Sequence, residues 1–381
     1  MASSKPRVVV YRDRLLPLSE TFVLDQAEAF TQFSPHYVGS TRDHGGLKLP
    51  RGRTTVLNPG TRYGRAAELT FKLTGRSATL RRHLTRLEPA LIHAHFGPDA
   101  TIVLPLAARL GLPLVCTFHG YDATVADSAM RDSRAWRLYV RRRPALAEYV
   151  TLVVAVSEFV ASRIHARGFS KDKIEVHNIG VDTRLFSPVS LERENLVLFV
   201  GRLVESKGCV HLIDALAQVQ RTRPVGLVVI GDGPLRAALE QRATRLLEGV
   251  RFLGPQPRSE VKRWLNRAKV FCVPPVVSSS GNAEGFGLVF LEAQAMGTPV
   301  VTFGSGGVAE AVDHAATGFV ETPGDDDALA RRIVMLLDDD GLWRRLSDAG
   351  MARIRKDFDL EVQSRKLEQL YLDRVLQQGS P

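Results

Sequence analysis

The sequence predicts an α/β protein of two doubly wound, Rossmann-like domains. Short apolar runs alternate with amphipathic stretches in both halves of the chain, as expected for parallel strands joined by crossover helices. This alternation breaks at residues 178–188 and then restarts, and 381 residues suffice for two domains with sizeable cores. We therefore expect domains at 1–187 and 188–359, with ligands bound at strand carboxyl ends and in a cleft between the domains.

In the first half, four short apolar runs have the length of buried strands, and the amphipathic stretches between them have the length of helices. The predicted strands are 7–11, 91–94, 113–117 and 152–156. The predicted helices are 20–30, 65–86, 100–110, 134–149 and 158–167. Residues 41–62 are rich in Gly, Pro, Thr and Arg, so we predict a loop there.

In the second half the same alternation predicts five strands and the helices between them. The predicted strands are 196–200, 226–230, 250–253, 270–273 and 300–303. The predicted helices are 210–221, 234–248, 259–268, 288–296 and 326–337, followed by a C-terminal helical segment. Gly297 and Pro299 mark the end of helix 288–296, because glycine favours a left-handed cap and proline cannot continue a helix.

The net charge of +10 belongs to the first half of the chain. Residues 1–190 hold 27 Lys and Arg against 16 Asp and Glu, whereas residues 191–381 hold 24 against 25. A basic face attracts anionic lipid, a phosphorylated substrate or nucleic acid, and the plain alternative is a solvated arginine-rich surface. The chain has no zinc-finger spacing or basic-aromatic repeat, so we expect no nucleic-acid partner.

The apolar segments and the cysteines predict a cytoplasmic protein. No apolar run approaches 18 residues, so we expect no transmembrane helix. Cys116, Cys209 and Cys272 lie isolated within apolar segments, which favours reduced core residues over disulfides.

A glycine loop that opens onto an apolar helix is the most informative pattern of the chain. Gly285 and Gly287 form the loop, and the helix begins at Leu288. Such a junction forms an anion site, because the first N–H groups of a helix have no partner within it. Glu284 and Glu292 flank the site. A carboxylate in an apolar helix is costly to bury unpaired, so Glu292 either faces solvent or binds sugar or ribose hydroxyls.

Two cations follow strand 196–200. Arg202 offers a planar fork and Lys207 a point charge, which together suit a diphosphate; the alternative is a solvated surface. Residues 231–234, with the sequence Gly-Asp-Gly-Pro, form a tight turn after strand 226–230. We interpret this turn as mainly structural, with a possible place in the wall of a nucleotide site.

Histidines gather at strand ends in the first half. His119 follows strand 113–117 and precedes a glycine, a position from which it can hydrogen-bond a sugar hydroxyl or a phosphate. The alternative is a buried histidine satisfied by the protein itself. His93 and His95 lie two residues apart, but no nearby third ligand completes a metal set, so we expect no metal site.

Together these patterns resemble the retaining glycosyltransferases of family 4, whose fold is GT-B. The block 284–301 carries that family's Glu-x7-Glu spacing. Residues 18–22 and 95–97 resemble the branch that builds bacterial exopolysaccharides and colanic-acid-type repeat units. The other matching segments are 201–203, 207–208, 231–234, 119–120, 157–158 and 180–182.

The resemblance implies a role for each matching position. Glu292 would hold the ribose hydroxyls of the donor. Arg202 and Lys207 would stabilise the departing diphosphate, and His119 would contact the transferred sugar. The implied catalytic residues are His119, Arg202, Lys207 and Glu284. The residues implied to hold the donor sugar and to lie near its phosphates are Glu284, Gly285, Phe286, Gly287 and Leu288.

The resemblance also implies transfer with retention at the anomeric carbon, without a cofactor or an obligatory metal. Residues 360–381 would return to the first domain, which would bind the acceptor, while 188–359 would bind the donor. Further acceptor or donor contacts are expected at Ser19, Glu20, Asp122 and Ser157, and Ser157 is alternatively a helix N-cap. Residues 12–20 lack the glycine-rich loop common in the family, and Ser19 is its possible substitute.

The leading hypothesis is a hexosyltransferase that moves a sugar from a nucleoside-diphosphate sugar, with UDP or GDP as the nucleotide. The acceptor is a saccharide, linked to a polyprenyl diphosphate, at the cytoplasmic face of an anionic membrane, where the enzyme is a peripheral protein. A sugar phosphorylase or a nucleotide-sugar epimerase of the same fold is the second reading. A basic module that binds membrane or nucleic acid without catalysis is the third, and it leaves Glu284 and Glu292 without a role.

Overall fold

The computed structural model describes residues 5–43, 45–190 and 192–377, and the chain divides into two compact units. Unit 1 runs to Gly180 and resumes at Leu360, and unit 2 is Val181–Asp359. Residues 181–187, which the sequence analysis placed in the first domain, belong to unit 2. The reason is a contact between segments distant in sequence, because the Val181 N–H donates to the Phe358 carbonyl and Thr183 Oγ1 donates to Asp359 over 2.6 Å.

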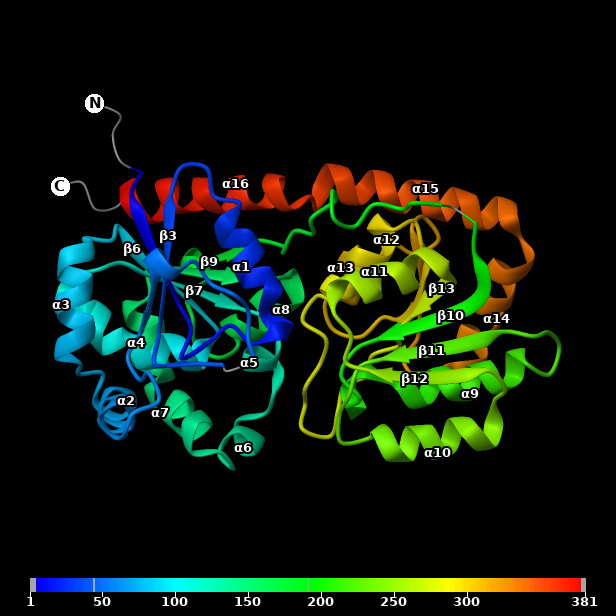
Figure 1. Ribbon diagram of the computed structural model, residues 1–381, viewed down its shortest axis with the longest axis horizontal. Coiled ribbons are helices and arrows are strands. Elements are labelled where there is room, and N and C mark those ends of the chain that lie inside the picture. The colour runs from blue at the N-terminus through cyan, green and yellow to red at the C-terminus, as the bar shows by residue number, and fades with distance from the viewer. Residues whose placement is uncertain (1–4, 44, 191, 378–381) are drawn as a thin grey trace. The chain divides into compact units, whose positions relative to one another are not determined.

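Unit 1 is built on a seven-stranded parallel sheet (Figure 1). Its order, β5-β3-β1-β6-β7-β8-β9, places the first strand in the middle, so the chain changes direction across the sheet between β1 and β6. Such a switch point opens a crevice at the strand carboxyl ends, where doubly wound folds bind ligands. The strands are β1 (Arg7–Tyr11), β3 (Ser34–Gly39), β5 (Thr54–Val56), β6 (Leu91–His95), β7 (Leu114–Phe118), β8 (Leu152–Ala155) and β9 (Ile174–Val176).

The connections of unit 1 hold more structure than the sequence analysis expected. The predicted loop 41–62 contains β4 (Thr41–Arg42), which pairs with β2 (Arg14–Leu15), and also η2 (Arg51–Arg53) and β5. The predicted helix 65–86 is two helices, because Ser77 Oγ accepts from the Leu80 N–H and starts a second one. The helices of the unit are η1 (Leu18–Glu20), α1 (Thr21–Glu28), α2 (Arg62–Thr74), α3 (Ala78–Leu87), α4 (Gly97–Leu110), α5 (Tyr121–Thr124), α6 (Asp127–Met130), α7 (Arg134–Tyr149), α8 (Glu158–His165) and η3 (Lys171–Lys173).

The C-terminal helix α16 (Leu360–Leu370) and the π-helical turn η5 (Tyr371–Leu376) complete unit 1, and α16 lies beside α1 (Figure 1). The carboxylate of Glu368 is fully buried. It accepts from Thr31 Oγ1 over 3.0 Å and from the backbone N–H groups of Gln32 and Phe33 over 2.6 and 3.0 Å. These bonds hold the C-terminal helix against the α1–β3 connection.

Unit 2 is built on a six-stranded parallel sheet of order β12-β11-β10-β13-β14-β15, and its switch point lies between β10 and β13. The predicted doubly wound α/β architecture is therefore confirmed in both units. The strands are β10 (Glu194–Val200), β11 (Gly226–Ile230), β12 (Val250–Gly254), β13 (Ala268–Cys272), β14 (Val300–Phe303) and β15 (Gly318–Glu321). The helices are η4 (Glu205–Lys207), α9 (Cys209–Val219), α10 (Arg236–Leu246), α11 (Arg258–Arg267), α12 (Leu288–Ala295), α13 (Val308–Ala311), α14 (Asp326–Asp338) and α15 (Asp340–Asp357).

Candidate active site

An ion pair spans the switch point of unit 2. Lys207 follows β10 and Glu284 follows β13, and the Lys207 ammonium contacts the Glu284 carboxylate. Both side chains are mostly buried, with 24% and 12% of their surface exposed. An ammonium has three donors, so Glu284 orients Lys207 and leaves it able to bind an anion. The predicted pair of cation and carboxylate therefore lies at the sheet edge where ligands of this architecture bind.

The loop after Glu284 is fixed by close backbone packing. Gly287 has a left-handed backbone with φ 92°, and a β-carbon there would lie 2.4 Å from the Phe290 ring. Gly306 approaches from the loop after β14, where a β-carbon would lie 2.0 Å from the Glu284 carbonyl oxygen. That carbonyl accepts from the Gly307 N–H over 2.9 Å. This packing therefore fixes the positions of Glu284 and of the N-terminus of α12.

Two further predicted donor residues belong to the same unit. Arg202 is exposed, and none of the residues that the structure describes pairs with its guanidinium. Glu292 lies within α12 with 14% of its side chain exposed, so it does not face bulk solvent. Its Oε1 lies 4.0 Å from Arg258 Nη2, and the Arg258 guanidinium stacks on Phe186 with 5.3 Å to the ring centre.

In unit 1, a buried arginine stands where the family carries a glycine-rich loop. Arg12 follows β1, and its guanidinium binds both oxygens of Glu20 over 2.8 and 2.7 Å. It also pairs with Asp99 of α4, and it lies 4.4 Å from the Phe96 ring centre. Burial raises the pKa of Asp99 to about 7 despite this partner. Glu20 therefore closes an ion cluster across the β1–β6 switch point, and the side chain of the exposed Ser19 beside it has no hydrogen-bond partner among the described residues.

Three histidines stack in a row behind this cluster. The rings of His93 and His95 lie 4.4 Å apart, and those of His95 and His119 lie 5.3 Å apart. His95 Nδ1 and His119 Nε2 form a hydrogen bond over 3.1 Å. His93 binds Tyr371 of η5 over 2.5 Å and Thr117 over 2.6 Å. Burial lowers the pKa of all three imidazoles, that of His93 to about 3, so the row is neutral at physiological pH.

The second nitrogen of His119 is available for a ligand. His119 Nδ1 is buried and has no hydrogen-bond partner within the described part of the chain. A buried polar atom without a partner is costly, and a sugar hydroxyl would satisfy it. The rings of Phe22 and Phe96 flank the imidazole, with centroids at 4.9 and 4.5 Å.

Asp122 and Ser157 hold backbone in place. The Asp122 carboxylate is fully buried and accepts from the N–H groups of Gly97, His119 and Gly120 over 2.9, 3.0 and 3.1 Å. Burial raises its pKa to about 6, against the effect of these bonds. Ser157 is also buried, and its Oγ accepts from the Val160 N–H as the N-cap of α8. Of the two readings for Ser157, the structure supports the helix cap.

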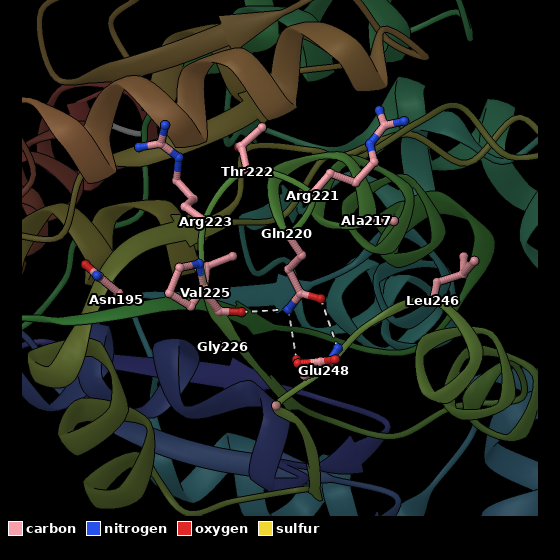
Figure 2. Close-up of a pocket in the computed structure, with 12 residues that line it drawn as sticks. Asn195, Ala217, Gln220, Arg221, Thr222, Arg223, Val225, Gly226, Leu246 and Glu248 are labelled. Atoms are coloured by element: carbon pink, nitrogen blue, oxygen red, sulfur yellow. Dashed lines mark hydrogen bonds between the residues drawn. The ribbon is translucent and has the colours of Figure 1, made fainter.

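One cavity lies away from these groups. A hollow of about 830 Å³ lies at the amino ends of the unit 2 strands, and Gln220 bridges the Val225 carbonyl and the backbone of Glu248 there (Figure 2). Asn195 and Gly226 on its wall stand near the starts of β10 and β11. Ligands of parallel sheets bind at the opposite edge, so we assign this cavity no part in the candidate site.

Within 5–43, 45–190 and 192–377, no three His, Cys, Asp or Glu side chains are grouped so as to hold a metal ion. None of the helices in the described part of the chain combines the length and apolar character needed to span a membrane.

Comparison with known proteins decides the family. A family model described as "Glycosyl transferases group 1" matches residues 182–353, and one described as "Glycosyltransferase Family 4" matches 19–185. The glycogen synthase of Mycobacterium tuberculosis is 30% identical over 74% of this chain and 69% of its own. The chain belongs to glycosyltransferase family 4. WcaL of Escherichia coli, named for colanic acid biosynthesis, is also 30% identical to this glycosyltransferase, over 73% of this chain and 69% of WcaL.

Solved structures confirm the fold of this glycosyltransferase. Sucrose-phosphate synthase of Thermosynechococcus elongatus superposes with a TM-score of 0.78 at 21% identity, over 97% of this chain and 98% of that one. Anabaena HepE, crystallised with UDP and glucose, superposes with a TM-score of 0.76 at 21% identity, over 96% and 99%. The expected GT-B class is therefore confirmed.

Sequence reasoning missed three parts of the two sites. Arg12 pairs with the predicted Glu20, and His95 contacts the predicted His119, but neither Arg12 nor His95 was itself predicted as a site residue. The loop 304–307 supports Glu284, and its Ser305 hydroxyl is buried with no partner among the described residues. Residues 304–307 hold three glycines directly after a buried strand, a sequence pattern from which this loop could have been predicted. No sequence pattern indicated that Arg258 lies beside Glu292.

Proposed function

We propose that this protein is a retaining hexosyltransferase that moves a sugar from a nucleoside-diphosphate sugar to a saccharide acceptor. The observation that carries the proposal is the grouping of Lys207, Glu284 and the α12 N-terminus at the unit 2 switch point, with the unpaired Arg202 on the strand end beside it. A diphosphate requires convergent positive charge and N–H donors. The crystallised UDP complex of Anabaena HepE supports a nucleotide donor, since that protein shares this fold.

The leaving group would be stabilised without a metal ion. Arg202 offers two parallel N–H groups to phosphate oxygens, Lys207 adds a point charge, and the α12 amides add partial positive charge. Glu292 accepts hydrogen bonds from the ribose hydroxyls, with Arg258 limiting its cost of burial. The backbone of 285–287 and the Glu284 carboxylate hold the donor sugar.

Transfer would proceed on one face of the donor sugar. The bond from the anomeric carbon to the phosphate oxygen breaks, and a bond to the acceptor hydroxyl oxygen forms on the same face. The acceptor proton passes to the departing phosphate oxygen, so the anomeric configuration is retained. His119 contacts the transferred sugar through the unpaired Nδ1, while His95 and the Asp122-bound backbone keep its imidazole in place.

The acceptor is proposed to be a lipid-linked saccharide of a cell-surface polysaccharide. The basic charge of the first 190 residues supports contact with an anionic membrane surface on the cytoplasmic side. Two relatives support the pathway, since WcaL is named for colanic acid biosynthesis and AmsK of Erwinia amylovora for amylovoran biosynthesis.

A thermal-shift panel of UDP- and GDP-sugars, followed by transfer assays, tests the proposal. A donor at 100 times its dissociation constant should stabilise the protein by about 2.7 kcal/mol. Transfer to a polyprenyl-diphosphate saccharide is expected to exceed transfer to the free sugar. Phosphate-dependent cleavage without nucleotide would instead identify a phosphorylase, and an epimerised nucleotide sugar would identify an epimerase.

A further inference from the structure

A second cavity, of about 980 Å³, opens at the switch point of unit 1. Arg12 and Asp13 line it from the carboxyl end of β1, and Phe96 and Asp99 line it from beyond β6. Helices α2 and α7 form its other walls. The cavity lies wholly within unit 1, at the sheet edge where this architecture binds ligands.

The inner part of the cavity offers a hydrogen-bond acceptor. Asp13 Oδ2 pairs with Lys72 over 2.7 Å, and Lys72 also binds Glu68 over 2.6 Å. The other oxygen, Asp13 Oδ1, is buried and has no hydrogen-bond partner among the residues described. Because Arg12 is engaged by Glu20 and Asp99, it does not satisfy this oxygen. A carboxylate oxygen accepts hydrogen bonds only, so the atom that fits it belongs to a hydroxyl or N–H donor.

The outer part carries uncompensated positive charge. Arg137 and Arg141 lie one helical turn apart on α7, and both are exposed. Neither guanidinium group has a hydrogen-bond or ion-pair partner in the described part of the chain. The acidic residues on the cavity wall are Asp13, Glu20 and Asp99, each already paired with Arg12 or Lys72. Two guanidinium groups without a counter-ion favour a phosphate or diphosphate ligand.

The remaining wall is apolar and partly open to solvent. Leu69 and Leu73, one turn apart on α2, line the cavity although 60% and 58% of their surface is exposed. Trp136 lines it from α7 and stacks edge-on against the Tyr121 ring at 4.7 Å. Arg142 ties the two helices together, donating to the Lys72 and Leu73 carbonyls at the end of α2. Exposed leucines beside an aromatic cavity are costly in water and favour an apolar ligand.

We propose that this cavity binds the acceptor as an amphiphile, a saccharide joined through a phosphate or diphosphate to an apolar chain. Asp13 Oδ1 accepts from a saccharide hydroxyl, Arg137 and Arg141 bind the anionic linkage, and Leu69, Leu73 and Trp136 contact the chain. The proposal deepens the proposed function, on which it rests, by assigning the acceptor class to named residues. A free sugar phosphate shares the saccharide and the anionic group but lacks the apolar chain, so the experiment separates the two sources.

Binding of farnesyl diphosphate to the full chain, with farnesol and inorganic diphosphate as partial probes, tests the assignment. Farnesyl diphosphate is expected to bind at least tenfold more tightly than either partial probe. Arg137→Gln with Arg141→Gln should weaken farnesyl diphosphate at least tenfold and leave farnesol unchanged. Leu69→Ser with Leu73→Ser should weaken both prenyl probes and leave inorganic diphosphate unchanged.

Matched variants guard against general charge and folding effects. Arg81→Gln with Arg82→Gln removes two exposed charges from α3 in the same unit and should leave binding of farnesyl diphosphate unchanged. Arg137→Lys with Arg141→Lys keeps the charge and should restore most of the affinity. Equal binding of inorganic diphosphate and farnesyl diphosphate would overturn the lipid assignment in favour of a free phosphate. An equal loss in the α3 control would overturn the assignment to α7.

The same proteins separate this inference from the proposed function. Binding of UDP- or GDP-sugars is measured in parallel and is expected to be equal in all four variants. Suppose that nucleotide sugars bind and are turned over, while the affinity for farnesyl diphosphate is unchanged in the α2 and α7 variants. The proposed acceptor site is then wrong, and the glycosyltransferase proposal stands. If the prenyl probe maps to α2 and α7 but no nucleotide sugar binds, the donor proposal fails and the site for an amphiphilic anion stands.

Discussion

His95 Nδ1 lies 3.1 Å from His119 Nε2, and this contact leaves His119 Nδ1 as the free nitrogen of a buried, neutral ring. His95 therefore acts on the reaction through His119, as a positioning residue. We predict that His95→Ala lowers kcat by about 5- to 150-fold, the effect of losing a buried hydrogen bond of about 1–3 kcal/mol, with little change in donor KM. His95→Asn, which keeps a polar group near His119, should recover part of the rate. An unchanged kcat in His95→Ala would contradict the positioning role.

Donor affinity should depend on Glu292. Removing a buried carboxylate that binds ribose leaves two hydroxyls without partners, a cost of about 1–3 kcal/mol. Glu292→Ala is therefore expected to raise the donor KM by about 5- to 150-fold, measured with the best nucleotide sugar of the thermal-shift panel. Glu260→Gln on α11 is the control, because among the described residues that glutamate forms an ion pair only with its helix neighbour Arg263. Equal donor KM values in the Glu292 variant and the wild type would contradict the proposal that Glu292 binds the ribose hydroxyls.

Lys207 and Glu284 should behave as one unit in catalysis. Lys207→Ala removes a cation from the departing diphosphate, so kcat should fall by about 10²- to 10³-fold. Glu284→Ala leaves the ammonium without its orientation and also removes a contact to the donor sugar. The double variant should therefore lose less than the sum of the two single losses. Additive losses across this double-mutant cycle, measured as kcat/KM, would show that the ion pair is incidental to the reaction.

The close approach of Gly306 to Glu284 should be visible in stability. Gly306→Ala places a β-carbon 2.0 Å from the Glu284 carbonyl at φ 69°, whereas Gly324→Ala meets open space at φ 89°. Both variants carry the left-handed backbone penalty of about 1–2 kcal/mol, so their difference isolates the clash. Gly306→Ala should lose more free energy of unfolding than Gly324→Ala by about 1–3 kcal/mol and should bind donor more weakly. Equal losses would contradict the packing of loop 304–307 on Glu284.

The buried histidines predict a dependence of stability on pH. His93 is neutral when folded, with a pKa of about 3, and takes up a proton near pH 6.5 when unfolded. Stability from this group is complete above pH 6.5 and is lost as pH falls toward 3. Between pH 7.5 and 5 the loss amounts to about 2 kcal/mol.

The raised pKa of Asp99 acts in the opposite direction in the same window, so the test compares two proteins. His93→Gln should lose about 2 kcal/mol less than the wild type when denaturant unfolding is repeated at pH 5 and 7.5. Identical pH dependence in both proteins would contradict a neutral His93.

The sequence patterns predicted the doubly wound class because a buried parallel strand is a short apolar run, which can be recognised without knowing which strands pair with it. The patterns failed for segments whose structure depends on contacts with residues distant in sequence. Residues 54–56 form edge strand β5, whose half-buried Thr-Thr-Val run carries no strong apolar signal. Residues 181–187 joined unit 2 through bonds to Phe358 and Asp359, which are distant in sequence.

The candidate site was predictable where motifs mark strand ends. Arg202, Lys207, Glu284 and His119 each follow a buried strand beside a glycine or a helix start. Partners such as Arg258 and Arg12 were not predictable, since an isolated arginine has no local pattern that separates a buried ion pair from a solvated surface. Asp122 shows another limit, because its position beside a motif did not reveal that its carboxylate accepts hydrogen bonds from the backbone N–H groups of Gly97, His119 and Gly120.

The anomeric configuration of the product tests the central claim most directly. The enzyme would be incubated with the best α-linked nucleotide sugar and its acceptor, and the new linkage examined by one-bond C–H couplings in NMR. Retaining transfer through the Arg202, Lys207 and Glu284 site predicts an α-linked product that forms only with nucleotide sugar present. A β-linked product, or cleavage driven by inorganic phosphate alone, would contradict the account.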